Sequence, residues 1–144
     1  MFRNGRRAKI LYVEDHEDTL ELVSIVLRKN KFDVTTANTF EDGNQLAHTC
    51  SFDLYLLDLW LPDGEGLQLA RLIREFDPNT PIVFFSAAAY EADRREALEA
   101  GAQAFLTKPA TPSELCDVIN ALVNFHPTHN TTRLLASAET RYLQ

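Results

Sequence analysis

Five short runs of aliphatic, β-branched and aromatic residues recur along the chain, separated by longer segments that mix apolar and polar positions. The runs are nearly continuous and lack the strict alternation of a half-exposed strand, a pattern typical of strands buried on both faces. They span residues 10–13, 32–36, 54–57, 82–85 and 104–106. We therefore predict five buried strands.

The segments between these strands carry apolar residues three or four positions apart, as Leu20, Val23 and Leu27 do in the first segment. This is the spacing of residues on one face of a helix. The predicted helices span residues 17–30, 40–50, 66–76, 89–100 and 112–125. Strict alternation of strand and helix predicts an α/β fold, a (βα)5 chain whose five parallel strands are covered by helices on both faces.

Composition and charge narrow the class of protein. The 144 residues are 45% hydrophobic and 24% charged, which suits one globular domain and excludes disordered and low-complexity chains. The net charge of -7 argues against direct binding of nucleic acid or of an anionic membrane. No apolar run is long enough to span a membrane, and the two cysteines fit no disulfide framework, so we expect a cytoplasmic protein. We expect a basic arm at 1–7, the domain at 8–125 and a polar tail at 126–144 that forms a short helix or linker.

Chemically active residues follow four of the five predicted strands. Glu14 and Asp15 come directly after the first strand, Asp58 after the third and Ser86 after the fourth, and Lys108 lies just beyond the fifth. Because the carboxyl ends of parallel strands lie at one edge of a sheet, these groups should converge where open α/β sheets bind ligands. A strand order of 2-1-3-4-5 explains why the second strand contributes nothing comparable, since it would lie at the edge of the sheet.

Three carboxylates at one site repel one another unless a cation neutralises them. Oxygen ligands favour a hard ion, and a few carboxylates completed by water and a phosphate oxygen suit Mg²⁺ better than a full Ca²⁺ cage. Beside such an ion, Asp58 is placed to accept a phosphoryl group whose oxygens the Ser86 hydroxyl and the Lys108 ammonium would hold. The predicted product is an aspartyl phosphate.

These motifs resemble the receiver domain of two-component response regulators, the CheY-like superfamily with a flavodoxin-like fold. The likeness covers about residues 8–125 and rests on four stretches that match in order and spacing. They are ILYVED at 10–15, LLDLWLPDG at 56–64, FFSA at 84–87 and FLTKP at 105–109. Each stretch is weak alone, whereas the four in this order are specific.

The resemblance implies how the site would be phosphorylated. Asp58 would accept the phosphoryl group from a phosphohistidine on a histidine kinase or a histidine phosphotransfer protein. Mg²⁺, for which Mn²⁺ would substitute, would be held by Glu14, Asp15, Asp58 and the backbone carbonyl of Trp60. A protein of this kind takes part in its own phosphoryl transfer and dephosphorylation, and it is not a dedicated metabolic enzyme.

The resemblance also implies a switch. Ser86 and Lys108 would bind phosphoryl oxygens, and the Phe105 ring would turn inward as Ser86 moves. A surface formed by the fourth helix, the fifth strand and the fifth helix, roughly residues 89–123, would then change shape and bind an output partner. Formation of a homodimer through the same elements on phosphorylation is compatible with this scheme.

Two positions beside the expected site are unusual for the family. Trp60 stands two residues after Asp58, and Ala88 stands two residues after Ser86. Neither side chain can orient a hydrolytic water, so we expect slow self-dephosphorylation. His16 follows the acidic pair, and we expect it to be an exposed loop residue rather than a metal ligand or a general base.

Three other functions are compatible with this fold, and the residues argue against the first two. A phosphatase of the haloacid-dehalogenase type needs a second acid two residues after its nucleophile, where this chain has Trp60. A flavin-binding module needs a phosphate-binding loop after the first strand, where Glu14 and Asp15 would repel the anion. A receiver-like scaffold that acts without phosphorylation is the alternative that the sequence leaves open, together with the cognate kinase, the output partner and the oligomeric state.

Overall fold

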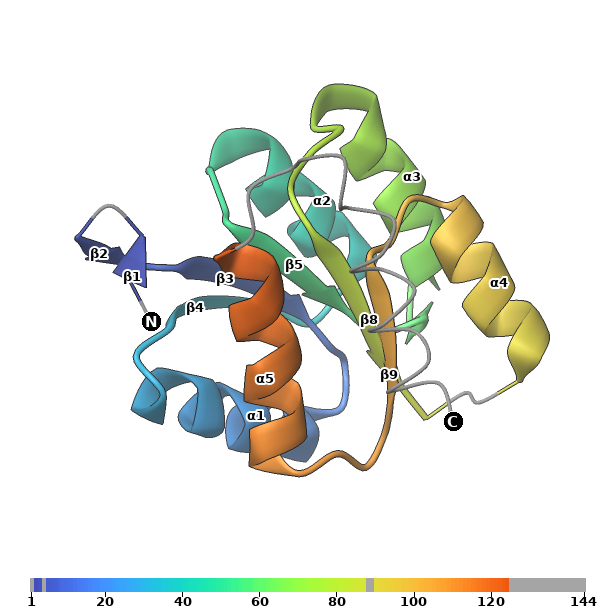
Figure 1. Ribbon diagram of the computed structural model, residues 1–144. Coiled ribbons are helices and arrows are strands. Elements are labelled where there is room, and N and C mark those ends of the chain that lie inside the picture. Colours follow the sequence, from blue (N-terminus) through green and yellow to red (C-terminus); the bar gives the residue numbers. More distant parts are fainter. Residues whose placement is uncertain (1, 4, 88–89, 125–144) are drawn as a thin grey trace.

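The computed structural model describes residues 2–3, 5–87 and 90–124 (Figure 1). In chain order the elements are β1 (Phe2–Arg3), β2 (Arg6–Arg7), β3 (Lys9–Val13), α1 (Glu17–Lys29), β4 (Asp33–Ala37), α2 (Phe40–Thr49), β5 (Leu54–Leu57), β6 (Trp60–Leu61), β7 (Gly64–Glu65), α3 (Gly66–Phe76), β8 (Ile82–Ser86), α4 (Glu91–Glu99), β9 (Ala104–Thr107) and α5 (Pro112–Val123). The five predicted strands and five predicted helices are all present, and their ends lie within two residues of the predicted ones.

The five predicted strands form one parallel sheet in the order β4-β3-β5-β8-β9. Counted among themselves along the chain, these strands have the order 2-1-3-4-5, and the predicted α/β fold class is confirmed. Because β4 lies at the edge of the sheet, the two strands that precede the acidic residues, β3 and β5, lie next to each other. The topology therefore brings the acidic residues together.

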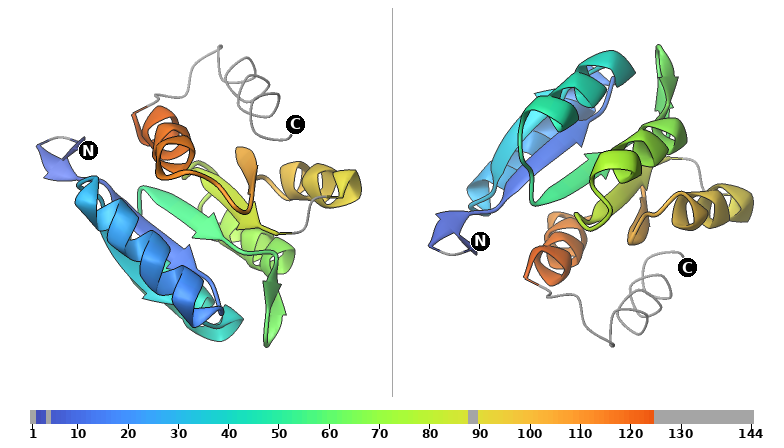
Figure 2. Two further views of the ribbon diagram at one scale, coloured as in Figure 1. Left: turned by 90° about the horizontal axis from the view of Figure 1, so that it is seen from below. Right: turned by 90° about the horizontal axis from the view of Figure 1, so that it is seen from above.

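Helices cover both faces of the sheet, as Figures 1 and 2 show. α1 and α5 pack on one face around Tyr12 and Leu56, and α2, α3 and α4 pack on the other around Leu57 and Phe84. Successive residues of β5 thus point into two different cores. This arrangement is the reason why the strands are apolar at nearly every position.

Local signals fix the ends of several helices. Thr39 caps α2, and its side chain accepts a hydrogen bond from the backbone N–H of Asp42 at 3.1 Å. His16, expected as an exposed loop residue, is exposed and also caps α1, because its Nδ1 accepts from the backbone N–H of Thr19 at 3.2 Å. Gly101 ends the fourth helical segment with a φ of 102°, a conformation that favours glycine.

Four two-residue strands have no counterpart in the prediction. β1 and β2 form a short hairpin in the segment expected to be a basic arm, and β6 and β7 form another in the loop after β5. The first hairpin is tied to the domain by an ion pair between Arg6 Nη1 and Asp53 Oδ2 at 3.1 Å. Asp53 also accepts from the backbone N–H of Lys9 at 2.7 Å. Pairing between residues 47 positions apart has no local sequence signal.

Several features named in the sequence fall beyond the structural description. Ala88, the helix ends predicted at residues 89 and 125, and the tail at 126–144 lie outside the described residues. The domain boundaries expected at residues 7 and 125 stay predictions. Within the part of the chain that the structure describes, no helix has the length and apolar character needed to cross a membrane.

Gly66 allows α3 to approach the strand end that carries Asp58. A Cβ atom at this position would overlap the Asp58 carbonyl oxygen, and the Gly66 N–H donates to the Leu59 carbonyl at 2.7 Å. We expect Gly66→Ala to lower the free energy of unfolding by about 3 kcal/mol, because backbone atoms would have to move. Urea unfolding would measure the change.

A matched control is Gln68→Ala, which alters an exposed position on the same helix and should change that free energy by less than about 0.5 kcal/mol. Similar unfolding free energies for the two variants would show that α3 shifts away from β5 without cost. In that case the close approach of the helix would not hold Asp58 in place.

Candidate functional site

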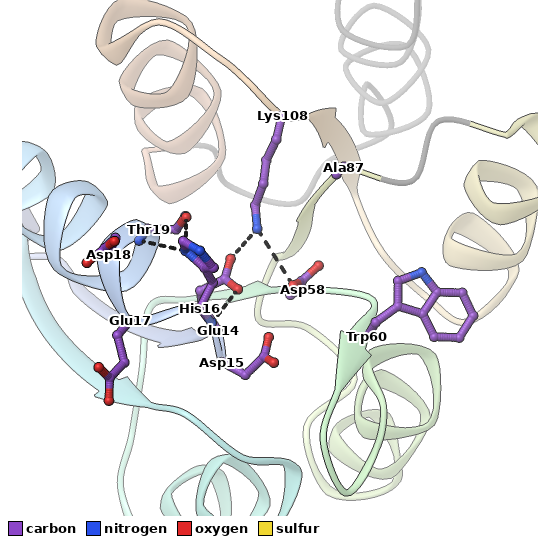
Figure 3. Close-up of a pocket in the computed structure, with 10 residues that line it drawn as sticks. All are labelled: Glu14, Asp15, His16, Glu17, Asp18, Thr19, Asp58, Trp60, Ala87 and Lys108. Atoms are coloured by element: carbon purple, nitrogen blue, oxygen red, sulfur yellow. Dashed lines mark hydrogen bonds and ion pairs between the residues drawn. The ribbon is translucent and has the colours of Figure 1, made fainter.

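The carboxyl ends of β3, β5, β8 and β9 open into one shallow depression of about 690 Å³. Glu14 and Asp15 follow β3, Asp58 follows β5, and Lys108 follows β9, and all four line this depression. Figure 3 shows their side chains converging from different elements, with the Trp60 indole at one side. The structure therefore brings together the charged groups that the sequence placed at separate strand ends.

Three carboxylates crowd the floor of this depression. Glu14, Asp15 and Asp58 each offer an oxygen, and these oxygens lie within 4.8 Å of one another. Glu14 and Asp58 are buried, with 1% and 8% of their surface exposed, whereas Asp15 is exposed. Two buried acids at such a separation need a compensating positive charge.

Lys108 supplies positive charge from the opposite side of the depression. Its Nζ donates to Glu14 Oε1 and lies 3.6 Å from Asp58 Oδ2 (Figure 3). The same ammonium lies 5.4 Å from the centre of the Phe85 ring, close enough for a cation–π contact. One cation is thus shared by two acids and an aromatic ring.

The electrostatic balance leaves Glu14 harder to ionise than a free glutamate. Burial is the largest cause that raises the pKa of Glu14, and the neighbouring Asp58 charge raises this pKa further. Hydrogen bonds from Lys108 and from the backbone N–H of His16 act in the opposite direction, and the pKa stays above its ordinary value. Burial and the Asp58 charge therefore outweigh the stabilisation that these hydrogen bonds give to the charged form of Glu14.

The two carboxylate oxygens of Asp58 have different surroundings. Oδ1 accepts a hydrogen bond from the backbone N–H of Leu59 at 2.8 Å, whereas Oδ2 faces the Lys108 ammonium. The backbone of Asp58 is fixed as well, because its N–H donates to the Val13 carbonyl at 3.0 Å. Oδ2 is consequently the oxygen that is available for chemistry.

Ser86 and Phe105, the two expected switch residues, are both buried. Ser86 ends β8 with 1% of its surface exposed, and the Phe105 ring is 0% exposed and stacks on Phe84 with ring centres 6.3 Å apart. The switch expected at these two residues stays a prediction.

The oxygen-rich donor set suits a hard divalent ion. The three clustered side chains offer carboxylate oxygens only, with no sulfur or imidazole ligand among them. Among the described residues, three ionised carboxylates share one ammonium, and a divalent cation would balance the excess of negative charge. The residues therefore fit Mg²⁺.

Asp63 and the His16 backbone support the site in ways that the sequence analysis missed. The Asp63 carboxylate accepts from the backbone N–H groups of Phe40 and Glu41 at 2.7 and 3.0 Å, which ties the loop after Asp58 to the start of α2. The backbone N–H of His16 donates to Glu14 Oε2 at 3.1 Å. An acid before a glycine is a signal for a loop, but the helix that it contacts cannot be found without the tertiary structure.

Removal of the Lys108 ammonium tests how much the shared cation stabilises the site. With EDTA present, we expect Lys108→Met to lower the free energy of unfolding at pH 7 by about 3 kcal/mol, because two buried acids lose their partner. The loss should be smaller at pH 5. At pH 5 a larger share of Glu14 is protonated, because its pKa is raised in the folded state, and the variant then buries less unpaired charge. The stability of the variant falls as pH rises through that pKa.

Urea unfolding at both pH values would measure this effect. Lys29→Met, at an exposed position in the last turn of α1, is the control and should change the free energy of unfolding by less than about 0.5 kcal/mol. An equal loss for Lys108→Met at pH 5 and pH 7 would show that packing of the lysine stem, and not charge, is responsible.

Comparison with known proteins matches this geometry to a family. The family model described as response regulator receiver domain matches residues 10–120. The response regulator protein PilR of Pseudomonas aeruginosa is 37% identical over 113 residues, which make up 78% of this chain and 25% of PilR. The chain spans between a quarter and about half of the length of the curated relatives it matches.

Solved structures agree with the sequence comparison. The non-phosphorylated HemR receiver domain from Leptospira biflexa has a TM-score of 0.79 at 32% identity, with 85% of this chain and 99% of that chain covered. The receiver domain of a sensor histidine kinase from Pseudomonas aeruginosa, with a magnesium ion coordinated in its active-site cleft, has a TM-score of 0.77 at 27% identity, covering 83% and 99%. By its sequence match and its fold, this chain belongs to the response regulator receiver domain family.

Proposed function

We propose that this chain is a Mg²⁺-dependent phosphoacceptor that takes a phosphoryl group from a phosphohistidine onto Asp58 and thereby changes a partner-binding surface. The observation that carries the proposal is the cluster of three carboxylates, Asp58 among them, with the Lys108 ammonium between two of them. The related sensor-kinase receiver domain with a magnesium ion in its cleft supports the choice of metal.

Asp58 would act as the nucleophile. Its Oδ2, which is free of backbone hydrogen bonds in the described structure, attacks phosphorus while the bond from phosphorus to the histidine nitrogen breaks. The electron pair of that bond leaves with the imidazole, and the product is an aspartyl phosphate. The Leu59 N–H keeps Oδ1 turned away from the incoming group.

Other residues would bind and balance the charges of the phosphoryl group. Glu14, Asp15 and Asp58 would hold Mg²⁺, with the Trp60 backbone carbonyl as a further ligand and Mn²⁺ as a substitute ion. When bound, the ion supplies neutralising charge for the phosphoryl oxygens. Lys108 would turn from Glu14 toward one of these oxygens.

On the output side, Ser86 would bind another phosphoryl oxygen at the end of β8, and the change would spread to the surface formed by α4, β9 and α5. Arg94 on α4 donates to the Thr107 hydroxyl at 3.2 Å, directly beside Lys108, and offers a path between site and surface. We propose that phosphorylation increases the population of an arrangement of this surface that is less populated without it.

The partners follow from the chemistry of the site and from the relatives. The donor would be a histidine kinase or a histidine phosphotransfer protein, and the output partner, or a second copy of this chain, would bind the surface formed by α4, β9 and α5. PilR is a response regulator protein, and this chain spans 25% of its length. We place the protein in the cytoplasm, where the free thiols of Cys50 and Cys116 would stay reduced.

Phosphorylation of the purified protein by a small donor tests the proposal directly. With Mg²⁺ and acetyl phosphate, we expect the intact mass to increase by one phosphoryl group, and the fluorescence of Trp60, the only tryptophan, to respond to Mg²⁺. Asp58→Asn should show no gain in mass, because it removes the nucleophile. Asp33→Asn, at an exposed position on β4, should behave as the wild type.

The opposite result is equally informative. A wild-type protein that gains no phosphoryl group and shows no fluorescence response to Mg²⁺ would contradict the phosphoacceptor role. It would favour a receiver-like scaffold that acts without phosphorylation.

Trp60 should lengthen the lifetime of the phosphorylated state. Its side chain is 54% exposed at the edge of the depression, and an indole beside Asp58 neither orients nor activates a hydrolytic water. We expect Trp60→Asn to speed loss of the phosphoryl group about tenfold, below the effect of a fully positioned general base. Decay of the phosphorylated mass after removal of the donor would measure this rate.

Trp60→Phe separates size from hydrogen bonding, because it keeps an aromatic ring without adding a polar group. It should retain a slow decay close to that of the wild type. Equal lifetimes for Trp60→Asn and Trp60→Phe would show that Trp60 does not control access of water to Asp58.

A further inference from the structure

Tyr12 carries a hydroxyl into a part of the sheet that is otherwise apolar. It lies on β3 two residues before Glu14, so the two side chains project from the same face of the strand. The side chain is 0% exposed. Among the described residues, the hydroxyl makes no hydrogen bond of ordinary geometry.

A buried hydroxyl without a hydrogen-bond partner destabilises the folded state, because folding removes it from water without giving it a new partner. Phenylalanine would fill the same space without that cost. After burial, the charges of Glu14 and Asp58 and the Glu14 side chain as a nearby acceptor raise the pKa of Tyr12, so the hydroxyl keeps its proton. It is therefore a buried donor close to the acidic cluster.

The Glu14 carboxylate would lose a hydrogen-bond donor once a cation or a phosphoryl group is bound at the site. In this structure Lys108 donates to Oε1 and the His16 backbone N–H donates to Oε2. A cation bound by the carboxylates would repel the Lys108 ammonium, and a phosphoryl oxygen would attract it. Either event would remove a hydrogen-bond donor from the Glu14 carboxylate, whose oxygens can each accept more than one bond and which is only 1% exposed.

We propose that Tyr12 is a positioning residue for Glu14, whose carboxylate accepts a hydrogen bond from the Tyr12 hydroxyl when the cation displaces Lys108. This inference rests on the proposed function, because it assumes that the carboxylates bind a divalent cation. Tyr12 would not touch the cation or the phosphoryl group. It would hold Glu14 in the orientation that binding requires.

Tyr12→Phe tests the role of this hydroxyl, and Tyr55→Phe is its matched control. Tyr55 is also buried in the sheet, but its hydroxyl donates to Asp77 Oδ2 at 3.4 Å, and Tyr55 belongs to the opposite core. Titration with Mg²⁺, followed through Trp60 fluorescence, should give a Kd about tenfold higher for Tyr12→Phe than for the wild type. Tyr55→Phe should leave the Kd unchanged.

The melting temperature in EDTA separates positioning from packing. Tyr12→Phe removes an unsatisfied hydroxyl and should melt no lower than Tyr55→Phe without metal, while its gain in melting temperature on addition of Mg²⁺ should be smaller. A Kd for Tyr12→Phe equal to that of the wild type would overturn the inference and leave the proposed function intact. No response of the wild type to Mg²⁺ would overturn both.

A measurement on the wild-type protein covers the case in which Tyr12→Phe does not fold. NMR of protein labelled at the tyrosine ring carbon that bears the hydroxyl should show the Tyr12 signal shifting on addition of Mg²⁺, with the Tyr55 signal unchanged. A Tyr12 signal that stays in place while other site signals shift would contradict the inference.

Discussion

Repulsion among three carboxylates is the constraint on which the rest of this structure depends. Glu14, Asp15 and Asp58 have oxygens within 4.8 Å of one another, and two of these acids are buried. In bulk solvent they would separate, but here they are fixed to the ends of two adjacent parallel strands and cannot. Lys108 offsets part of the repulsion, and the remaining negative charge suits the proposed binding of a divalent cation. The fold thus holds an excess of negative charge that a bound cation would neutralise.

The scaffold holds the acidic residues in place mainly through contacts made by the backbone. The Asp58 N–H is bound to the Val13 carbonyl, so the two acidic strand ends are joined directly. Gly66 lets α3 pack against the Asp58 carbonyl, and Asp63 holds the following loop to the start of α2. A site held in this way keeps its geometry while charges change, which is what preorganised electrostatic stabilisation requires.

Much of this arrangement was predictable from the sequence because it follows from periodicity and position. Continuous apolar runs gave the parallel sheet, and placing Glu14, Asp58 and Lys108 after strand ends gave the cluster. The pairing of Arg6 with Asp53 and the isolation of the Tyr12 hydroxyl were not predictable, because each depends on which distant residues meet in three dimensions.

The proposed switch needs a group whose interactions differ between the unphosphorylated and the phosphorylated protein. A ligand shifts an equilibrium only by its difference in affinity for the two states. In the proposed mechanism Lys108 supplies such a difference, because its ammonium is shared by Glu14 and Asp58 and would be attracted by a phosphoryl oxygen. Competition between carboxylate and phosphoryl oxygens for this one cation would then supply the differential interaction in this mechanism. The Thr107 hydroxyl beside it, which accepts a hydrogen bond from Arg94, would carry the change toward α4.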